Sequence, residues 1–446
     1  MAAPLRIALA GLGTVGAGVI RLLEANGALI ARRAGRPIAI TVVSARDRAK
    51  DRGVDLSGFA WEDDLTLLAE RADVDVVVEL VGGADGPALS LARRTLAAGK
   101  GLVTANKAMV AHHGMELAAT AEAARDGRGA PFRFEAAVAG GIPVIKGLRE
   151  GAAANSLARI YGILNGTCNY ILSTMEDTGR DFAEVLKEAQ ALGYAEADPA
   201  FDIEGIDAAH KLAILAAIGF GAGVDFTSVD IAGITRIRAA DIAQAAALGY
   251  VIRLIGLADC QGRGADGAAR LFQRVQPCLV PRDHPLAAVD GPTNAVVAEG
   301  DFSGRLLFQG PGAGDGPTAS AVVADLIDIA RGDTGPPFSV PVAELEPLAR
   351  ADPGDRRNRT YLRFAVADRP GVLAEITAAM RDAGVSIESL IQQGRPDAGG
   401  EDGAPAEVLV AMVTHEAPER AVAHALDLLR GSPSLAEPPL VMRLLE

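Results

Sequence analysis

Short runs rich in β-branched residues alternate with helical stretches over residues 5–130. Each run has the length of a buried strand, and helical periodicity separates one run from the next. The strand-like runs are LRIALA (5–10), IAITVVS (38–44), DVDVVVELV (73–81) and KGLVTAN (100–106). This strand, helix, strand order predicts a parallel sheet with helices on both faces.

A second region, of mixed α/β texture, begins at Phe132. Its strand-like runs are FRFEAAVA (132–139), RIYGILN (159–165) and RLFQRVQPCLV (270–280). We therefore predict an α+β domain over residues 132–317, after a first domain of residues 1–131. An amphipathic helix at 318–331 is expected to pack back on the first domain. Residues 332–356 are dense in Pro, Gly and charge, which is typical of a linker.

The C-terminal region, residues 357–446, contains its own set of elements. Their order is the ferredoxin-like βαββαβ order. Strands are predicted at 360–366, 386–393, 407–415 and 439–445, and helices at 372–384 and 419–430. A glycine-rich acidic loop at 394–406 joins the second and third strands. We expect this region to be a separate module.

Composition limits the partners and the compartment. The chain carries 43 basic and 57 acidic residues, a formal net charge of −14, and such a field repels nucleic acid and anionic membranes. We expect neither as a partner. Cys168, Cys260 and Cys278 are widely spaced, which favours a reducing compartment over disulfides or a structural zinc site. No export pattern precedes the first strand, so a cytoplasmic location is expected.

The motif GLGTVG stands directly between the first predicted strand and a helix. Glycines there permit a tight turn, close approach of the backbone to a pyrophosphate and tight helix–strand packing, with the phosphates at the helix N-terminus. The first domain is therefore predicted to be a Rossmann-type NAD(P)-binding domain. The candidate cofactor-binding residues of the loop are Gly11, Gly13, Thr14, Val15 and Gly16.

Two basic residues follow strand ends, where open α/β sheets bind their ligands. Arg46 follows the second predicted strand, at the place where an arginine accepts the 2′-phosphate of NADP. It favours NADP, with NAD also open, and a solvated loop charge is the alternative. Lys107 follows the strand that ends in TAN and is placed to reach a cofactor or substrate. The alternative for Lys107 is a solvated charge at a helix start.

The stretch AQALGYAEADPAFDIEGIDAAHK, residues 189–211, crowds acidic residues around one basic pair. Asp207 and Lys211 are spaced i, i+4, so on a helix they share a face. The residues after Lys211 are apolar on every side, which predicts a buried helix with a partly desolvated lysine at its entrance. Burial lowers the pKa of a lysine and a neighbouring carboxylate raises it, a balance that suits a proton donor at neutral pH. A stabilising surface ion pair is the alternative.

With these residues the chain resembles the homoserine dehydrogenases that have a C-terminal ACT domain. Residues 189–211 match the signature of that family, and similar segments occur along nearly the whole chain. They are GLGTVG (11–16), ELVGG (79–83), TANKA (104–108), EAAVAGGIPVI (135–145), ILNGTCNYIL (163–172) and GPGAGDGPTASAVV (310–323). The implied fold class is α/β, with a Rossmann-type domain, an α+β catalytic and dimerisation domain, and a ferredoxin-like ACT domain.

The resemblance implies the reversible reduction of L-aspartate 4-semialdehyde to L-homoserine with NAD(P)H, in the biosynthesis of threonine, isoleucine and methionine. By this resemblance Lys211 is the proton donor to the alkoxide, and Asp202 is a partner that orients the lysine. Asp207 is similar in position to a substrate-binding acid, and Glu196 to the carboxylate that holds the substrate ammonium. Lys107 matches a second active-site lysine that also contacts the cofactor.

Further contacts are implied by the resemblance alone. Gly193 and Gly310 look like backbone contacts to the nicotinamide side. EAAVAGGIPVI resembles a loop that binds a structural monovalent cation such as Na⁺, mainly through main-chain oxygens. Its candidate ligands are Glu135, Val138, Gly140 and Ile142. The adjacent His112 and His113 lack an acidic or cysteine partner at ligand spacing, and we interpret them as ordinary helix residues.

In the C-terminal module, DRPGVLAEI (368–376) resembles the effector loop of an ACT domain. Asp368 is the candidate partner of an ammonium group, and Gly371, Val372 and Leu373 complete the candidate effector site. Threonine is the expected effector, and a module that only dimerises is the alternative. The resemblance also implies a homodimer or a homotetramer.

Two other functions compete with this interpretation. Esterifying or phosphorylating semialdehyde dehydrogenases need a nucleophilic cysteine beside a histidine, and none of the three cysteines has that setting. A catalytically inactive amino-acid sensor with a relic Rossmann fold predicts the loss of Lys211, Asp207 or Glu196. All three are present.

Overall fold

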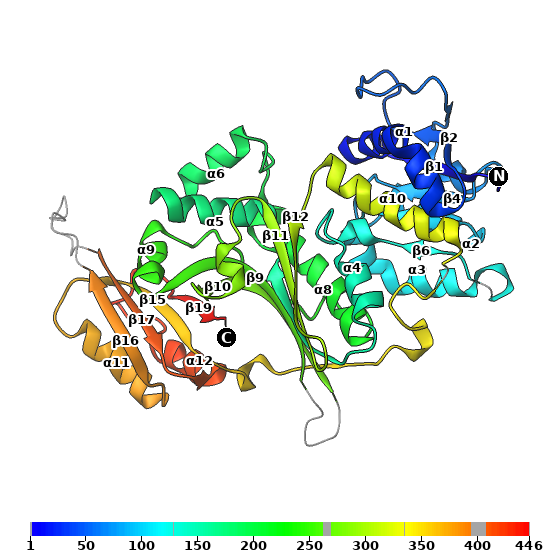
Figure 1. Ribbon diagram of the computed structural model, residues 1–446. Coiled ribbons are helices and arrows are strands. Elements are labelled where there is room, and N and C mark those ends of the chain that lie inside the picture. Colours follow the sequence, from blue (N-terminus) through cyan, green and yellow to red (C-terminus); the bar gives the residue numbers. More distant parts are fainter. Residues whose placement is uncertain (1, 128, 262–268, 334, 394–406, 446) are drawn as a thin grey trace.

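The chain folds into three groups of elements, which Figure 1 shows from the blue N-terminal group through the green one to the orange C-terminal group. The computed structural model describes all residues except 1, 128, 262–268, 334, 394–406 and 446. The glycine-rich acidic loop expected at 394–406 therefore lies outside the described residues.

The first group is built on a parallel sheet with the strand order β3-β2-β1-β4-β5-β6. Its strands are β1 (Leu5–Ala10), β2 (Ile38–Ser44), β3 (Ala60–Trp61), β4 (Val76–Glu79), β5 (Gly101–Thr104) and β6 (Phe132–Arg133). Residues 7–10 of β1 are fully buried, as aliphatic strands are in a sheet that is covered on both faces. The predicted Rossmann-type fold is confirmed.

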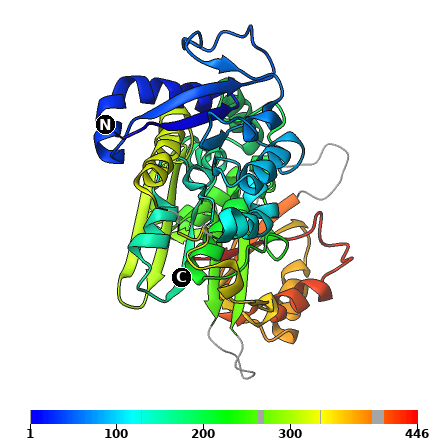
Figure 2. The ribbon, with the colours of Figure 1, turned by 90° about the vertical axis from the view of Figure 1, so that its right-hand side faces the viewer.

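Three helices of the N-terminal region and one from much later in the chain cover this sheet. They are α1 (Thr14–Ala34), α2 (Pro87–Ala97), α3 (Lys107–Gly127) and α10 (Asp315–Arg331). Helix α10 lies against α1 (Figure 2), where a Cβ at Gly18 would stand 2.9 Å from the carbonyl oxygen of Asp315. Among the described helices α1 alone is long and apolar enough to cross a membrane, but here it follows the first strand and packs on α10.

The boundary predicted before Phe132 is corrected by the structure. Phe132 and Arg133 pair with Leu102 and Val103 of β5, so they form the sixth strand of the first sheet. Beyond them the strand-like run 132–139 turns into the short 3-10 helix η2 (Glu135–Ala137). Phe132 is fully buried, and this burial beside β5 accounts for the strand pattern that the sequence shows.

The second group packs helices against one face of an antiparallel sheet ordered β12-β11-β7-β9-β10. Its strands are β7 (Leu157–Ile163), β9 (Tyr250–Gln261), β10 (Arg270–Pro281), β11 (Thr293–Gly300) and β12 (Gly304–Pro311). Its helices are α4 (Val144–Lys146), α5 (Gly166–Thr178), α6 (Phe182–Ala191), α7 (Ala200–Ile203), α8 (Ile206–Phe220) and α9 (Ala239–Ala247). Residues 207–218 of α8 are all buried, as predicted from the apolar run after Lys211.

The third group has the predicted ferredoxin-like fold. Its elements are β15 (Thr360–Ala367), α11 (Val372–Asp382), β16 (Ile387–Gln393), β17 (Glu407–Thr414), α12 (Glu419–Leu428) and β19 (Leu440–Leu444). The strands are ordered β19-β15-β17-β16, as the βαββαβ order requires.

The third group has its own hydrophobic core, as expected of a module, but it shares a sheet with the second group. Strand β19 also pairs with β10, through Cys278 with Arg443 and Leu279 with Leu444, so one sheet of 11 strands continues through both groups. Buried Asp241 of α9 also accepts hydrogen bonds from Tyr361 and Arg363 of β15. A strand pattern shows neither the edge to which the strand will pair nor a buried ion pair, which is why this junction was missed.

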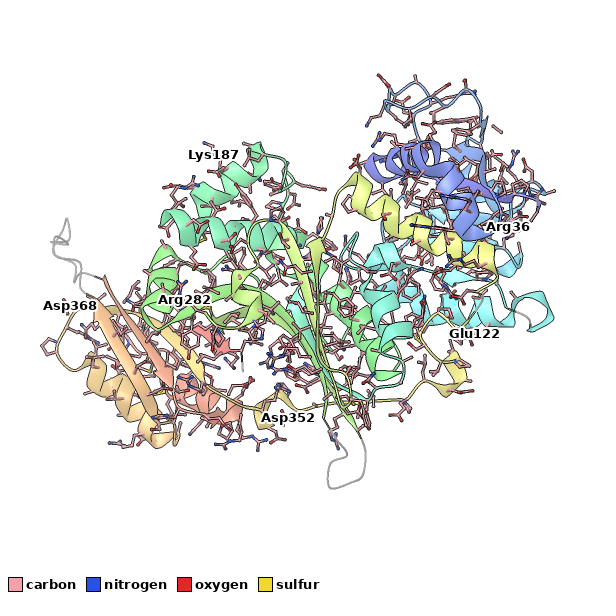
Figure 3. The ribbon with its side chains drawn as sticks, viewed as in Figure 1. Arg36, Glu122, Lys187, Arg282, Asp352 and Asp368 are labelled. Atoms are coloured by element: carbon pink, nitrogen blue, oxygen red, sulfur yellow. The ribbon has the colours of Figure 1, made fainter. Side chains whose placement is uncertain are left out.

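The segment predicted as a linker, residues 332–356, packs first against the first group and then against the second. Phe338 is fully buried with its ring 5.2 Å from that of Phe134, and Glu122 of α3 accepts the N–H of Val342. Farther along, β13 (Ala349–Arg350) pairs with β10. Figure 3 labels Glu122 and Asp352 near the two ends of this path. Apolar and backbone contacts therefore hold the segment in place.

Candidate active site

A cavity of about 1120 Å³ lies where the first and second groups meet. The first residue of α3, the N-terminus of α5 and the first turns of α8 line it. Strand ends and helix N-termini thus converge on one space, as in the ligand sites of open α/β folds. The predicted residues that line the cavity are Val15, Lys107, Gly140, Gly193, Glu196, Asp202, Asp207, Lys211 and Gly310.

The GLGTVG loop has the space that a pyrophosphate needs. Gly11 has a φ of 102°, and a Cβ there would stand 2.7 Å from the carbonyl oxygen of Leu80. A Cβ at Gly16 would stand 2.2 Å from the carbonyl oxygen of Gly11, so α1 begins close against the turn. A Cβ at Gly13 meets nothing within 4 Å. The loop is therefore tight on its inner side and open at the N-terminus of α1, where phosphates bind.

Two arginines flank the loop from the side of β2. Arg46 is exposed two residues beyond β2 and is therefore accessible to a ligand. Arg52, which the sequence pattern did not mark, donates from Nε to the carbonyl oxygen of Leu12 at 3.0 Å and so supports the glycine loop. Only the fold shows this contact, because the two residues lie 40 positions apart in the chain.

A buried carboxylate paired with two lysines forms the centre of the site. Asp207 Oδ2 is 2.7 Å from Lys211 Nζ, and its Oδ1 is 3.0 Å from Lys107 Nζ. Burial alone would raise the pKa of Asp207, but the charges of Lys211 and Lys107 lower it below its ordinary value. The Asp207 charge in turn raises the pKa of Lys107 against the effect of burial. Asp207 is therefore ionised at neutral pH.

Asn165, which we did not predict, joins the carboxylates of this site. Its Nδ2 donates to Asp207 Oδ2 and to Asp202 Oδ1, both at 2.8 Å. Its Oδ1 accepts the N–H of Cys168 and so caps α5. The carbonyl oxygen of Leu164, the residue before Asn165, accepts a hydrogen bond from Lys211 Nζ at 2.7 Å. In the sequence, Asn165 stands in an NGT segment before a predicted helix. That segment alone does not distinguish an active-site amide from an ordinary helix cap.

The structure places Asp202 differently from its implied role. Lys211 contacts Asp207 and Leu164, whereas Asp202 accepts hydrogen bonds from Asn165 and from Thr167 Oγ1, the latter at 2.9 Å. Asp202 therefore acts on the lysine through Asn165 and Asp207. Thr167 is a second cavity residue that the sequence analysis did not mark.

The EAAVAGGIPVI loop contains a buried carboxyl group, that of Glu135. The Glu135 carboxylate accepts the N–H groups of Ile145 and Lys146 at 3.0 and 2.9 Å. Asp325 of α10 accepts the N–H of Glu135, and its Oδ1 accepts no hydrogen bond among the described residues. Burial and the neighbouring Asp325 raise the pKa of Glu135 to about 8.

The main-chain oxygens of this loop suit a cation in part. Val138 and Gly140 are buried, and over the described ranges of the chain no backbone N–H donates to their carbonyl oxygens. The carbonyl of Ile142, by contrast, accepts the N–H of Val144 at 2.7 Å. Buried carbonyls beside two buried carboxyl groups form an oxygen donor set of the kind that hard cations bind.

His112 and His113 lie on helix α3, as expected, and each contacts a residue that is distant in the chain. The Nε2 atoms of His112 and His210 lie 3.2 Å apart, and Phe226 packs against both rings. His113 pairs with Asp85 at 2.9 Å, so it has the acidic partner that spacing along the chain did not show. Burial and His112 lower the pKa of buried His210 to about 4.

The predicted effector residues lie together at the turn between β15 and α11. Gly371 has a φ of 98° and precedes α11, whose first residues are Val372 and Leu373. Asp368 is exposed, and Figure 3 shows it at the outer edge of the third group. None of these residues lines the large cavity. The turn is therefore spatially separate from the lysine and carboxylate cluster.

Comparison with known proteins identifies the family. Three family models match: "Homoserine dehydrogenase, NAD binding domain" over residues 11–127, "Homoserine dehydrogenase" over 143–327 and "ACT domain" over 360–429. The homoserine dehydrogenase of Pseudomonas aeruginosa is 43% identical over 446 residues, 99% of this chain and 98% of that protein. The chain belongs to the homoserine dehydrogenase family.

Two further relatives agree with this assignment. The homoserine dehydrogenase of Neisseria gonorrhoeae is 42% identical over 447 residues, which cover 99% of this chain and 98% of that protein. The crystal structure of a homoserine dehydrogenase from Thiobacillus denitrificans superposes with a TM-score of 0.90 at 41% identity, covering 100% of this chain and 99% of that one. As a homoserine dehydrogenase family member, the chain is an oxidoreductase with a nicotinamide-binding domain, a small-molecule substrate and an ACT regulatory domain.

We predict that Asn165→Ala lowers the homoserine dehydrogenase kcat by about 10- to 100-fold, because hydrogen bonds to charged groups contribute about 1.5–3 kcal/mol. Steady-state kinetics check this. The matched control is Asp64→Ala, which removes a cap on a short 3-10 helix, Leu65–Ala69, away from the cavity. Equal kcat in the two variants would show that Asn165 is a helix cap only.

A pH dependence follows from His210. A histidine whose pKa falls from 6.5 to about 4 on folding binds fewer protons in the folded state than in the unfolded state. The free energy of unfolding therefore decreases as pH falls from about 6.5 through about 4, by roughly 3 kcal/mol at most. We predict that His210→Phe, which retains an aromatic ring beside Phe226, flattens this part of the profile. Urea denaturation between pH 4.5 and 7 compares the slopes, and parallel slopes would contradict the prediction.

Proposed function

We propose that the enzyme catalyses the reversible reduction of L-aspartate 4-semialdehyde to L-homoserine with NAD(P)H, a step toward threonine, isoleucine and methionine. The observation that carries this proposal is the buried Asp207 carboxylate, paired with Lys211 and Lys107 on the wall of one cavity. This carboxylate holds the ammonium groups of Lys211 and Lys107 next to the dinucleotide fold. The reaction needs such a proton donor beside the carbon that accepts hydride.

The substrate is an amino acid, so the site must also hold an ammonium and a carboxylate group. Glu196 lines the cavity and is exposed to it, which suits it to the substrate ammonium. The N-terminus of α5, at Gly166 and Thr167, lines the same cavity, and helix N-termini favour carboxylates. Gly193 and Gly310 give their backbone to the nicotinamide side of the cavity.

Lys211 is the proton donor in this proposal. Bound NAD(P)H supplies the hydride to the aldehyde carbon, and charge develops on the aldehyde oxygen. Lys211 Nζ donates to Asp207 and Leu164, so its remaining N–H is directed to the substrate oxygen and gives up a proton there. In the oxidative direction the same amine removes that proton. Lys107 and Asp207 orient the substrate, while Asp202 and Asn165 fix Asp207.

NADP is the proposed cofactor, with NAD accepted as well. Gly11, Gly13, Thr14, Val15 and Gly16 would bind the pyrophosphate, because the space at Gly13 and the N-terminus of α1 fit it. Exposed Arg46 beyond β2 favours the 2′-phosphate of NADP.

A structural Na⁺ is proposed at the loop between η2 and α4. Its ligands would come from Glu135, Val138, Gly140 and Ile142, with Asp325 beside them. The ion would balance the buried negative charge and stiffen the loop. No proton or hydride passes through it.

We also propose the cellular and assembly context. The first domain is the dinucleotide fold, which ends with β6 at Arg133. A catalytic and dimerisation domain follows up to residue 317, and the ACT domain begins at residue 357. Helix α10 belongs with the first domain and residues 332–356 connect the last two. The enzyme is a cytoplasmic homodimer or homotetramer, without nucleic acid or membrane partners.

The inactive sensor with a relic Rossmann fold has no observation in its favour. The glycine loop, both lysines and the acids of the cavity are all present, and Asp207 pairs with both lysines on the cavity wall. The cysteines likewise do not support an esterifying dehydrogenase. Cys168 is fully buried, and that burial raises the pKa of its thiol well above the ordinary value.

We predict that Lys211→Ala lowers homoserine-dependent reduction of NADP by at least about 1000-fold, since it removes the proton-transfer group. NADP binding, measured by calorimetry, stays within a factor of a few. Lys187→Ala is the control, because this exposed lysine of α6, labelled in Figure 3, does not line the cavity. Unchanged turnover in Lys211→Ala would refute the proposed mechanism.

We further predict that millimolar threonine inhibits the enzyme and that Asp368→Asn raises the half-inhibiting concentration at least tenfold, because it removes the charge that pairs with the effector ammonium. Asp382→Asn, at the other end of α11, is the matched control on the same domain. An enzyme insensitive to threonine, or equal inhibition of both variants, would contradict the assignment of this turn.

A further inference from the structure

A second, smaller cavity lies at the seam where the ACT domain joins the catalytic domain. Its volume is about 30 Å³, and it shares none of its lining residues with the active-site cavity. Strands β7, β9 and β10 form one wall, and the start of the ACT domain with β19 forms the other. Figure 3 shows side chains tipped with nitrogen gathered between the two domains, above the labelled Asp352.

Positive charge is concentrated in this seam cavity. Its lining includes four arginines, namely Arg159, Arg274, Arg356 and Arg443, and one acid, Glu419. Glu419 accepts hydrogen bonds from Arg274 at 2.8 Å and from Arg443 at 2.9 Å. One carboxylate thus accepts hydrogen bonds from two guanidinium groups. Farther from the cavity, Asp259 pairs with Arg356, and Asp230 lies 3.5 Å from Arg274.

Arg443 also carries a donor without an acceptor. Its side chain is 15% exposed, and its buried Nε makes no hydrogen bond within the part of the chain that the structure describes. A buried N–H of a charged group that lacks an acceptor costs free energy. The cavity has room for two or three water-sized atoms, at about 10–15 Å³ for each. That matches the two oxygens of a carboxylate, or two or three of the four oxygens of a phosphate group.

We infer that the seam cavity binds one small oxyanion, a carboxylate or a phosphate group. Guanidinium groups present paired N–H donors that match the paired oxygens of such groups. Arg159 and Arg274 lie on strands of the catalytic domain, whereas Arg443 lies on β19 of the ACT domain. The bound anion therefore links the two domains across the seam. Because its readout is binding and not turnover, this inference stands apart from the proposed reaction.

Inorganic phosphate is the probe for a first experiment on the full-length chain. Sodium phosphate replaces sodium chloride at constant ionic strength, and calorimetry gives the Kd while thermal unfolding gives the shift in Tm. We expect saturable binding at one site per chain and a Tm that rises with phosphate. Arg443→Gln weakens binding at least about tenfold, because it removes a charged hydrogen-bond donor. Arg430→Gln is the control, since this arginine is 81% exposed at the end of α12.

A second variant, with the opposite expected effect on phosphate binding, distinguishes loss of the site from a general loss of stability. Glu419→Gln removes the carboxylate that competes for the arginines, so we expect it to tighten phosphate binding. Absence of phosphate binding to the parent enzyme, or equal binding by the Arg443 and Arg430 variants, would overturn the inference.

Competition then identifies the source of the oxyanion. If acetate displaces phosphate, the natural ligand is a carboxylate. If acetate does not displace it, the ligand is a free phosphate group. Both results keep the oxyanion site and differ only in its occupant.

Discussion

A carboxylate that is buried away from water is stable only where other charges and hydrogen bonds replace its hydration. Asp207, 3% exposed, imposes this condition on the whole catalytic domain. Its partners are Lys107 of the dinucleotide fold, Lys211 of its own helix and Asn165 before α5. Satisfying one charge thus fixes how the nucleotide fold sits on the catalytic domain. The arrangement of the two domains and the position of Lys211, the proposed proton donor, have the same physical cause.

The ACT domain is attached by a similar condition at a different place. Asp241 is fully buried, and besides the N–H of Arg238 at the start of its own helix it accepts hydrogen bonds from Tyr361 and Arg363 of the ACT domain. Together with the pairing of β19 and β10, it makes the regulatory domain a continuation of the catalytic sheet. The proposed effector turn is therefore connected to the catalytic domain by hydrogen-bonded strands and a buried ion pair.

Local signals made much of this structure predictable. The strand before GLGTVG, the helix after it and the apolar run after Lys211 are patterns within about twenty residues, and each forms the expected element. Contacts between distant residues could not be read in this way. His112 and His210 lie 98 positions apart, and nothing in either helix pattern brings them together. Phe132 likewise has a strand pattern that is compatible with either sheet. Asn165 looks like a helix cap, and only its distances to Asp202 and Asp207 show its second contact.

The pairing of β19 with β10 has a consequence for how the polypeptide is made. Arg443 pairs with Cys278, 165 residues earlier in the chain. During synthesis this edge of β10 stays unpaired by β19 until the ACT domain has been translated. Exposed strand edges can pair with other chains. A chain released before the ACT domain is complete has an open edge at this part of the catalytic sheet, and its Asp241 lacks Tyr361 and Arg363. We therefore expect such a fragment to aggregate more readily than the complete chain.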